Sequence, residues 1–256
     1  MSEVVACLAT IPSRSKQLKL VCESLLPQVD RLFIYFNNYQ DEEVPPWAKS
    51  IDKIEYETSS SGEYGDLGDV GKFYFCSEEM RDKYGINGYV FTCDDDIVYP
   101  DWYTKRTSHF IEYNYPDCLL SYHGSIILRR NSPYHVNGTR RTYFASKTVS
   151  NVTPVHVGGT GCMCFHTSTF RPSLKIFKHT NMSDIFVAVW ADGQGVRTLV
   201  LPHMSGEFLV LDVPETIFDN SHNGTGSSMD RRHQTGIEIS SIRWPTLPSP
   251  HQMIND

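Results

Sequence analysis

The 256-residue sequence lacks any apolar run that approaches the ~20 residues needed by a membrane-spanning helix. Residues 1–14 lack a basic segment followed by a long apolar stretch, so we expect no secretory signal. These absences predict a cytoplasmic chain without an integral membrane segment. Glycans are then not expected on the Asn-x-Ser/Thr sequences, which begin at Asn137, Asn151, Asn181 and Asn223.

The sequence also lacks the regularly spaced cysteines of a disulfide framework or a zinc knuckle. Its seven cysteines are an odd number, and they lie in apolar strand-like or helical stretches. Cys162 and Cys164 are separated by one residue, whereas zinc knuckles use a two-residue gap. We therefore expect reduced, buried thiols and no zinc site.

A surplus of basic residues is absent as well. The chain has 23 Lys and Arg against 30 Asp and Glu, which gives a formal net charge of −7 at pH 7. The acidic residues are spread along the chain, and nothing resembles the basic stripe of a dedicated nucleic-acid binder. One local basic cluster keeps a nucleic-acid partner open as a minority alternative, and it comprises Arg129, Arg130, Arg140 and Arg141.

What the sequence does contain is an acidic triplet within residues 89–100 (YVFTCDDDIVYP). Residues 89–93 have the composition of a buried strand, and Asp94, Asp95 and Asp96 follow at once. Adjacent carboxylates repel one another unless a cation or hydrogen-bond donors compensate them. At the carboxyl end of a strand in an α/β sheet, the natural compensator is a hard divalent metal that holds phosphate oxygens. A solvated acidic turn is the alternative, and the apolar residues on both sides argue against it.

The order of the apolar segments predicts an α/β fold. A continuous apolar run at 4–9 predicts a strand covered on both faces, and 32–36 predicts a second strand. A helical pattern at 15–26, with Ser15 as its cap, joins them, so the chain opens with a parallel crossover. Further strands are predicted near 51–56, 89–93, 118–122, 126–128, 162–166 and 196–201, and further helices near 71–84, 101–113 (capped by Asp101) and 185–190.

Two glycine-rich segments allow the backbone to approach a ligand closely. Residues 59–73 combine four glycines with Asp66, Asp69 and Lys72, but the Gly-Lys-Ser/Thr of a Walker loop is missing. The Gly-Gly-Thr-Gly sequence at 158–161 is either a second such place or a hairpin turn.

Taken in chain order, these motifs resemble those of GT-A glycosyltransferases, and most of all the family-2-like enzymes associated with bacterial surface polysaccharides. A lone DxD is common in proteins, so the ordered set carries the resemblance, which spans roughly the whole length. The set comprises a strand ending in Thr-Ile-Pro-x-Arg, a second ending in Asn-Asn, a Gly-Asp-x-Gly-Lys-like segment, Asp-Asp-Asp, Gly-Gly-Thr-Gly, and Asn-Met-x-Asp before Leu-Pro-His.

The resemblance implies a GT-A (Rossmann-like) fold with a mixed, mostly parallel central sheet and helices on both faces. It implies one domain over 1–256, in which 1–122 bind the nucleotide sugar and 123–218 supply acceptor and catalytic groups. Residues 219–256 would form a tail that packs on the domain. Within the second half, the apolar pattern fails at 129–152, which predicts a loop or a lid that orders with ligand.

For the donor, the resemblance implies a nucleotide sugar, most simply UDP-linked, held through Mn²⁺ or Mg²⁺. The metal would be bound by Asp96, with Asp94 in support and His203 completing the shell. The sequence has no Gln-x-x-Arg-Trp and no membrane helix, which argues for transfer of a single sugar. Contacts to the nucleotide or donor sugar are implied for Thr10, Pro12, Arg14, Asn38, Asp66, Lys72, Asp94, Asp95, Gly159 and Thr160.

For catalysis, the resemblance implies that Asp184 is the general base of an inverting transfer and deprotonates the acceptor hydroxyl. A structural role is the alternative, because the first turn of a helix stabilises a carboxylate through the helix dipole. His123 would lie at the acceptor mouth, and a surface glycan is the implied acceptor.

Several alternatives stay open at this point. The transfer could retain the anomeric configuration, and a hydroxylated base in nucleic acid is a minority acceptor. A nucleotidyltransferase also uses strand-end carboxylates, but it is expected to have a glycine-rich loop after the first strand, and residues 10–14 contain no glycine. From another class, a non-catalytic nucleotide- or sugar-binding module would lose nothing when Asp184 is replaced.

Overall fold

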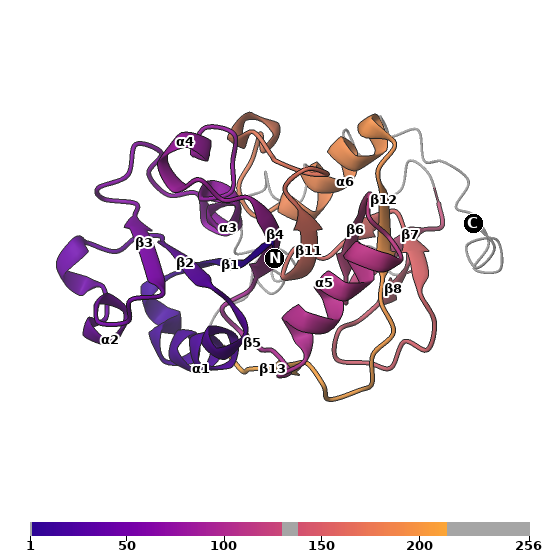
Figure 1. Cartoon of the computed structure of the whole chain (residues 1–256), viewed down its shortest axis with the longest axis horizontal. Coiled ribbons are helices and arrows are strands. Elements are labelled where there is room, and N and C mark those ends of the chain that lie inside the picture. Colours follow the sequence, from indigo (N-terminus) through magenta and orange to yellow (C-terminus); the bar gives the residue numbers. More distant parts are fainter. Residues whose placement is uncertain (1, 130–137, 214–256) are drawn as a thin grey trace.

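The structure is a computed structural model that describes residues 2–129 and 138–213. These residues form an eight-stranded central sheet with the order β3-β2-β1-β4-β11-β6-β12-β9 (Figure 1). Its strands are β1 (Glu3–Thr10), β2 (Arg31–Phe36), β3 (Ile54–Thr58), β4 (Gly88–Cys93), β6 (Cys118–Ser121), β9 (Thr153–Val155), β11 (Cys162–His166) and β12 (Arg197–Val200).

The sheet is mixed and mostly parallel, as predicted. β1 pairs parallel with β2 and β4, and β2 pairs parallel with β3. β11 lies antiparallel between β4 and β6, β12 runs parallel to β6, and β9 is antiparallel at the edge. The two halves of the chain are therefore interleaved, because β11 from the second half joins two strands of the first.

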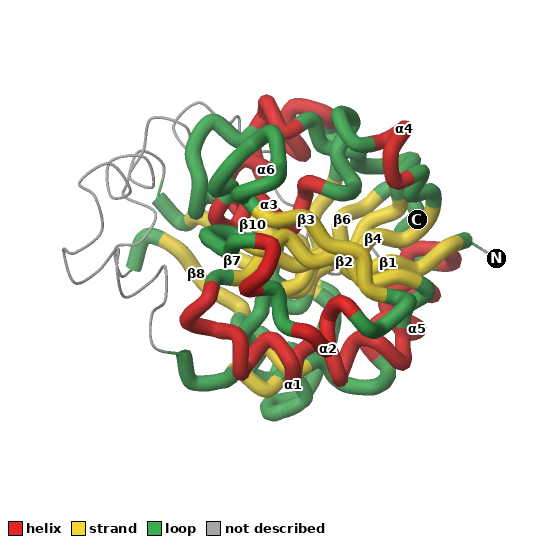
Figure 2. The backbone as a smooth tube through the Cα atoms, turned by 90° about the vertical axis from the view of Figure 1, so that its left-hand side faces the viewer, coloured by secondary structure: helices red, strands yellow, loops and turns green. Residues whose placement is uncertain are grey.

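Helices cover both faces of the sheet, which confirms the predicted α/β class. Figure 2 shows α1, α2 and α5 on one side and α3, α4 and α6 on the other. Alternate β1 residues face the two layers: Leu8 packs in the cluster with α1 and α5, and Cys7 in the cluster with α3 and α6. The helices are α1 (Ser15–Leu25), α2 (Pro46–Lys49), α3 (Gly71–Tyr74), α4 (Arg81–Tyr84), α5 (Tyr103–Tyr113) and α6 (Ser183–Gln194).

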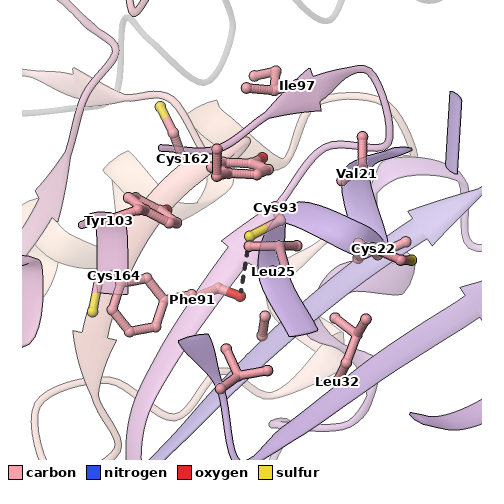
Figure 3. Close-up of a cluster of buried hydrophobic side chains, with 14 of the residues drawn as sticks. Val21, Cys22, Leu25, Leu32, Phe91, Cys93, Ile97, Tyr103, Cys162 and Cys164 are labelled. Atoms are coloured by element: carbon pink, nitrogen blue, oxygen red, sulfur yellow. Dashed lines mark hydrogen bonds between the residues drawn. The ribbon is translucent and has the colours of Figure 1, made fainter. Parts of the chain in front are cut away.

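The larger core cluster lies between the sheet and helices α1 and α5. Figure 3 shows Leu25 of α1, Phe91 of β4 and Tyr103 of α5 within it, and the Phe91 and Tyr103 rings meet edge to face at 5.0 Å. Cys93 and Cys162 fill the same cluster as small apolar residues. All seven cysteines are free and buried, as the sequence predicts.

Two smaller sheets flank the central one. β5 (Ile97–Val98) pairs with β13 (Leu209–Val210), and a three-stranded sheet has the order β10-β7-β8, with β7 at Gly124–Ile127 and β10 at Val157–Gly158. β8 (Arg140–Tyr143) lies inside the stretch predicted to be a loop or lid, so that prediction is wrong for those residues. They are held by antiparallel backbone pairing with β7. Because this pairing does not need apolar side chains, the sequence shows no strand pattern there.

The helix predicted over 71–84 is also wrong in its middle. α3 ends at Tyr74 and α4 begins at Arg81. Between them, Glu79 accepts hydrogen bonds from the Ser173 hydroxyl at 2.6 Å and the Leu174 amide at 2.9 Å. The Glu78 amide also bonds to Pro172 O at 2.9 Å, so a distant segment takes a backbone donor that a continuous helix would use internally.

Neither predicted helix cap is formed. Arg14 is the N-cap of α1 and Trp102 the N-cap of α5, and neither helix has a side-chain cap. The chain enters each helix through a tight backbone turn, in which the Arg14 amide bonds to Ile11 O and the Tyr103 amide to Pro100 O. Ser15 is therefore already the first residue of α1, and Asp101 lies one residue before the N-cap of α5.

The Gly-Gly-Thr-Gly sequence links β10 to β11, which belong to different sheets, so it is not a hairpin turn. Among the described helices, none is long and apolar enough to cross a membrane. The predicted tail at 219–256 and Arg130 lie outside the described residues, and the single-domain boundaries stay a prediction.

Candidate active site

The candidate active site lies at the sheet edge where β1, β2 and β4 end. Thr10 ends β1, Asn37 follows β2 and Asp94 follows β4. Because the three strands are parallel, their carboxyl ends share one edge. β11 runs the other way, so Gly161, which precedes it, reaches the same edge and accepts a hydrogen bond from the Asp94 amide at 3.3 Å.

All three carboxylates of the acidic triplet face cations from other elements. Nη1 of Arg14 lies 2.6 Å from Oδ1 of Asp95 and 3.7 Å from Oδ2 of Asp96. Lys72, from α3, donates through Nζ to Oδ1 of Asp94. The fold thereby brings two cations from separate elements onto the acidic triplet. The two cations and the three carboxylates are all predicted site residues.

Asp96 is the least compensated carboxylate of the triplet. Burial raises its pKa to about 7, and the negative charges of Asp94 and Asp95 act in the same direction. Arg14 and Lys72 oppose this rise only in part. The Asp96 side chain is 20% exposed, so a ligand can reach it. A cation nearby would favour the charged form of such a carboxylate.

The predicted metal would have few protein ligands at this site. The described part of the chain contains no group of three or more His, Cys, Asp or Glu placed to hold a metal ion. Mg²⁺ and Mn²⁺ need no such group when water and a diphosphate complete the shell around one or two carboxylates. Asp96 fits such a site because its charge has no full partner, and Asp94 next to it could support the ion.

His203 does not fit the metal role implied by the sequence resemblance. It is buried, with Nδ1 at 2.8 Å from Leu201 O and Nε2 at 3.1 Å from Phe144 O. Both ring nitrogens therefore face backbone carbonyls, which leaves neither for a metal. The ring packs edge to face against Tyr122 and Phe208, so its observed role is to join two loops.

Gly161 and Tyr99 fix the position of Asp94. A Cβ atom at Gly161 would overlap the Asp94 carboxylate, so only glycine fits there. The buried Tyr99 hydroxyl accepts from the Asp94 amide at 2.8 Å and donates to Gly161 O. The backbone of the predicted glycine-rich turn thus contacts the acidic triplet directly.

Asp184 lies in the first turn of α6 and is oriented by the Gly-Gly-Thr-Gly turn. Its Oδ1 accepts from both the amide and the hydroxyl of Thr160, each at 2.7 Å. All hydrogen bonds to this carboxylate from the described residues fall on Oδ1, which leaves Oδ2 to accept a proton. The structure thus joins two predicted site residues 24 positions apart in sequence.

His123 lies next to the Gly-Gly-Thr-Gly turn. Its carbonyl accepts from the Gly159 amide at 2.8 Å, and a Cβ at Gly159 would come within 2.8 Å of the His123 side chain. Burial lowers the pKa of His123, and the charge of Asp184 only partly opposes this. The half-exposed Phe144 ring meets His123 edge to face at 5.5 Å, and forms an apolar surface there.

The predicted nucleotide side is built by the end of β2 and the segment 65–68. Asn38, at φ 60°, donates through Nδ2 to Asp66 at 3.0 Å, and Asp66 accepts from the Gly68 amide at 2.9 Å. Asn38 and Asp66 are exposed, as is Pro12 at the start of the turn before α1. The Thr10 side chain is buried, and its hydroxyl has no hydrogen-bond partner among the described residues.

Four residues of this site were not singled out from the sequence. Tyr99 follows the acidic triplet, Gly161 ends the glycine-rich turn, and Asp69 bonds to Ser183 at the start of α6. Gly161 and Asp69 stand inside motifs that were recognised, so their position in the motif was the available signal. Nothing local marks Tyr99 or Ser183, because Gly161 lies 62 positions from Tyr99 and Asp69 lies 114 positions from Ser183.

The sequence matches no known family model, and no curated protein matches it. One similar solved structure is a candidate nucleotide-diphospho-sugar transferase from Desulfovibrio desulfuricans, at 12% identity and a TM-score of 0.47 over 99% of this chain and 94% of that one. Another is a mannose-1-phosphate geranyltransferase from Thermus thermophilus, at 12% identity and a TM-score of 0.38 over 66% of this chain and 58% of that one. At TM-scores below 0.5 these likenesses assign no activity, so a function has to be argued from the site.

Proposed function

We propose that this chain is a metal-dependent glycosyltransferase that moves one sugar from a nucleotide sugar, most simply UDP-linked, to an acceptor hydroxyl with inversion. A surface glycan is the proposed acceptor. One observation carries the proposal: an incompletely compensated, accessible carboxylate, Asp96, stands at the same sheet edge as Asp184, whose carboxylate is held through Oδ1 alone by the described residues.

On the donor side, Mg²⁺ or Mn²⁺ bound at Asp96 would neutralise the charge that develops on the departing diphosphate. The protein's own part is to keep the triplet rigid. Arg14 holds Asp95, and Lys72 holds Asp94, so the field around Asp96 is fixed before a ligand arrives. Asn38 and Asp66 present polar groups to the nucleoside.

On the acceptor side, Asp184 is the proposed base. The acceptor oxygen forms a bond to the anomeric carbon while the bond from that carbon to the diphosphate oxygen breaks, and the hydroxyl proton moves to Oδ2 of Asp184. Thr160 keeps Oδ1 in two hydrogen bonds, so the carboxylate presents a fixed oxygen. Phe144 and His123 would contact the acceptor ring.

The donor site is tested by thermal shift or calorimetry with UDP, GDP, CMP and dTDP, each with and without Mn²⁺, on wild type, Asp96→Ala and Asp52→Ala. Asp52 is exposed in the turn before β3 and serves as the matched control. We expect one nucleotide to stabilise wild type and Asp52→Ala only with Mn²⁺, and the effect to vanish in Asp96→Ala. Absence of stabilisation by every nucleotide would remove the support for this proposal.

The transfer step is tested with Asp184→Asn, which keeps the size of the side chain and an oxygen for Thr160. Nucleotide binding should be unchanged, and transfer should fall by about 10²–10⁴-fold. The acceptor panel pairs oligosaccharides with DNA that carries a hydroxylated base. If no binding or transfer signal responds to Asp184→Asn, a non-catalytic binding module or another base accounts for the site.

A further inference from the structure

Asp69 accepts hydrogen bonds from three donors at the amino end of α6. Asp69 lies in the short helical turn Gly68–Val70, within the glycine-rich segment. Oδ1 accepts from the Asn181 amide at 2.6 Å, and Oδ2 accepts from the Ser183 amide at 3.0 Å and from the Ser183 hydroxyl. In return, Oδ1 of Asn181 accepts from the Asp69 amide at 3.4 Å. We refer to these four bonds as the Asp69 clasp.

The clasp caps the amino end of α6 with a side chain from another part of the chain. The N-cap residue of α6, Met182, supplies no side-chain hydrogen bond, and the first amides of a helix have no partner within it. A carboxylate at this end also interacts favourably with the helix dipole. The Asp69 carboxylate therefore fixes where α6 begins.

The backbone on both sides is shaped for this contact. Asn181 adopts φ 63°, a left-handed conformation that asparagine tolerates better than most residues. Gly68 adopts φ 53°, and a Cβ atom there would come within 2.7 Å of Oδ1 of Asn181. Both conformations bring the two segments to hydrogen-bond distance, 112 positions apart in sequence.

From the clasp, contacts continue to the proposed base. The Ser183 hydroxyl lies 2.9 Å from the Thr160 hydroxyl, and Thr160 holds Oδ1 of Asp184 through two hydrogen bonds. Asp184 is the next residue after Ser183, so any shift of the helix start moves its carboxylate away from Thr160. Asp69 itself uses both oxygens in the clasp and is partly buried.

The clasp is also linked to the triplet by charge. Lys72, which donates to Asp94, is buried, and burial lowers its pKa. The charges of Asp94, Asp69 and Asp184 outweigh this effect and raise the pKa of Lys72 above its usual range. One buried ammonium group thus lies among carboxylates from the triplet, the clasp and the α6 helix.

We propose that Asp69 is a positioning residue that holds the amino end of α6 and thereby keeps Asp184 bonded to Thr160. The role assigned to Asp184 rests on the proposed function. The clasp also joins the segment expected to face the donor to the helix that carries the base. Loss of Asp69 should therefore loosen Asp184, while Lys72 keeps its hydrogen bond to Asp94 on the donor side.

The first test measures amide hydrogen exchange and needs no substrate. The variants are Asp69→Asn, which keeps the size of the side chain, and Val187→Ala, a buried α6 position outside the clasp. With rates normalised to β1 amides as reporters of global unfolding, Asp69→Asn should speed exchange at Thr160 and Ser183 by about 10-fold or more. Val187→Ala should not single out Thr160. Unchanged exchange at both amides in Asp69→Asn, or an equal effect of Val187→Ala, would overturn the proposal.

The second test measures release of nucleoside diphosphate from whichever nucleotide sugar stabilises the wild type with Mn²⁺. Asp69→Asn should lower kcat by about 10–100-fold with the Kd of the nucleotide within about twofold, while Val187→Ala keeps kcat. A raised Kd with unchanged kcat would make Asp69 a donor contact and overturn the proposal. Faster Thr160 exchange in Asp69→Asn, together with a wild type that turns over no donor, would support the clasp and refute the glycosyltransferase function.

Discussion

Single residues of the site carry charge that the fold only partly neutralises. Asp94 and Asp95 each have a cation within hydrogen-bond distance, whereas Asp96 shares Arg14 at 3.7 Å. A carboxylate in this position destabilises the ligand-free protein. Such an arrangement is typical of a functional site, because the same deficit of positive charge favours a bound cation.

Replacing Asp96 with Asn should stabilise the metal-free protein at pH 8. The folded-state pKa of about 7 lies above the ordinary value of 3.8, so the folded state holds a proton that the unfolded state releases. The destabilisation therefore grows as the pH rises from about 4 to about 7 and is complete above that. We expect a gain on the order of 1–2 kcal/mol at pH 8, which disappears near pH 4, from urea unfolding in EDTA.

Asp52→Asn is the control for this comparison, since Asp52 is exposed. It should show no pH-dependent gain. A lower stability of Asp96→Asn than of wild type at pH 8 would mean that Arg14 and Lys72 fully compensate Asp96.

Gly161→Ala should damage the site because the new methyl group overlaps the Asp94 carboxylate. The loss of stability should be on the order of 2 kcal/mol, and nucleotide binding with Mn²⁺ should weaken in parallel. Gly193→Ala is the matched control, because no atom lies within 4 Å of a Cβ there and alanine favours the α6 helix. Calorimetry and urea unfolding give both quantities, and equal behaviour of the two variants would refute the close contact.

At the scale of elements, local sequence patterns predict the buried strands that an apolar run alone specifies. β4 and β11 were predicted to within one residue, because an uninterrupted apolar run is enough to specify a buried strand. β8 and the break between α3 and α4 could not be predicted. Each depends on a partner far away in sequence, β7 for the strand and the segment at 173–174 for the break.

Glu79→Gln tests the contact that separates α3 from α4. Burial alone would raise the pKa of Glu79, but the hydrogen bonds from Ser173 and Leu174 lower it below its usual range. The stabilisation is therefore present above the unfolded pKa near 4.5 and is lost as the pH falls through the folded pKa. We expect a loss on the order of 1 kcal/mol at pH 7 in urea unfolding, which shrinks in acid.

Glu78→Gln is its neighbour control, since Glu78 is exposed and, in the described part of the chain, its carboxylate pairs with Arg81 at 3.7 Å. Nucleotide binding should be the same in both variants. An equal loss in Glu78→Gln would show that the two hydrogen bonds contribute nothing specific.

At the scale of the whole molecule, the site is assembled from chain positions 10 to 184. Its strand-end residues were predictable because parallel strands place their carboxyl ends on one edge. The pairing of Asp184 with Thr160 was not, since it depends on how α6 meets the turn before β11. His203 shows the reverse case: its motif position suggested a metal ligand, but its ring nitrogens lie within hydrogen-bond distance of two loop carbonyls.

The seven buried thiols report whether the whole molecule unfolds as one unit. Burial raises the pKa of Cys162 to about 12, so the native thiol is both shielded and protonated at pH 8. β11, which carries Cys162, lies between β4 and β6, so the halves 1–122 and 123–218 share one sheet. We therefore expect mass spectrometry during slow alkylation to show chains with no label or seven labels. A population labelled only at Cys162 and Cys164 would show that the halves open separately and would contradict the single-domain prediction.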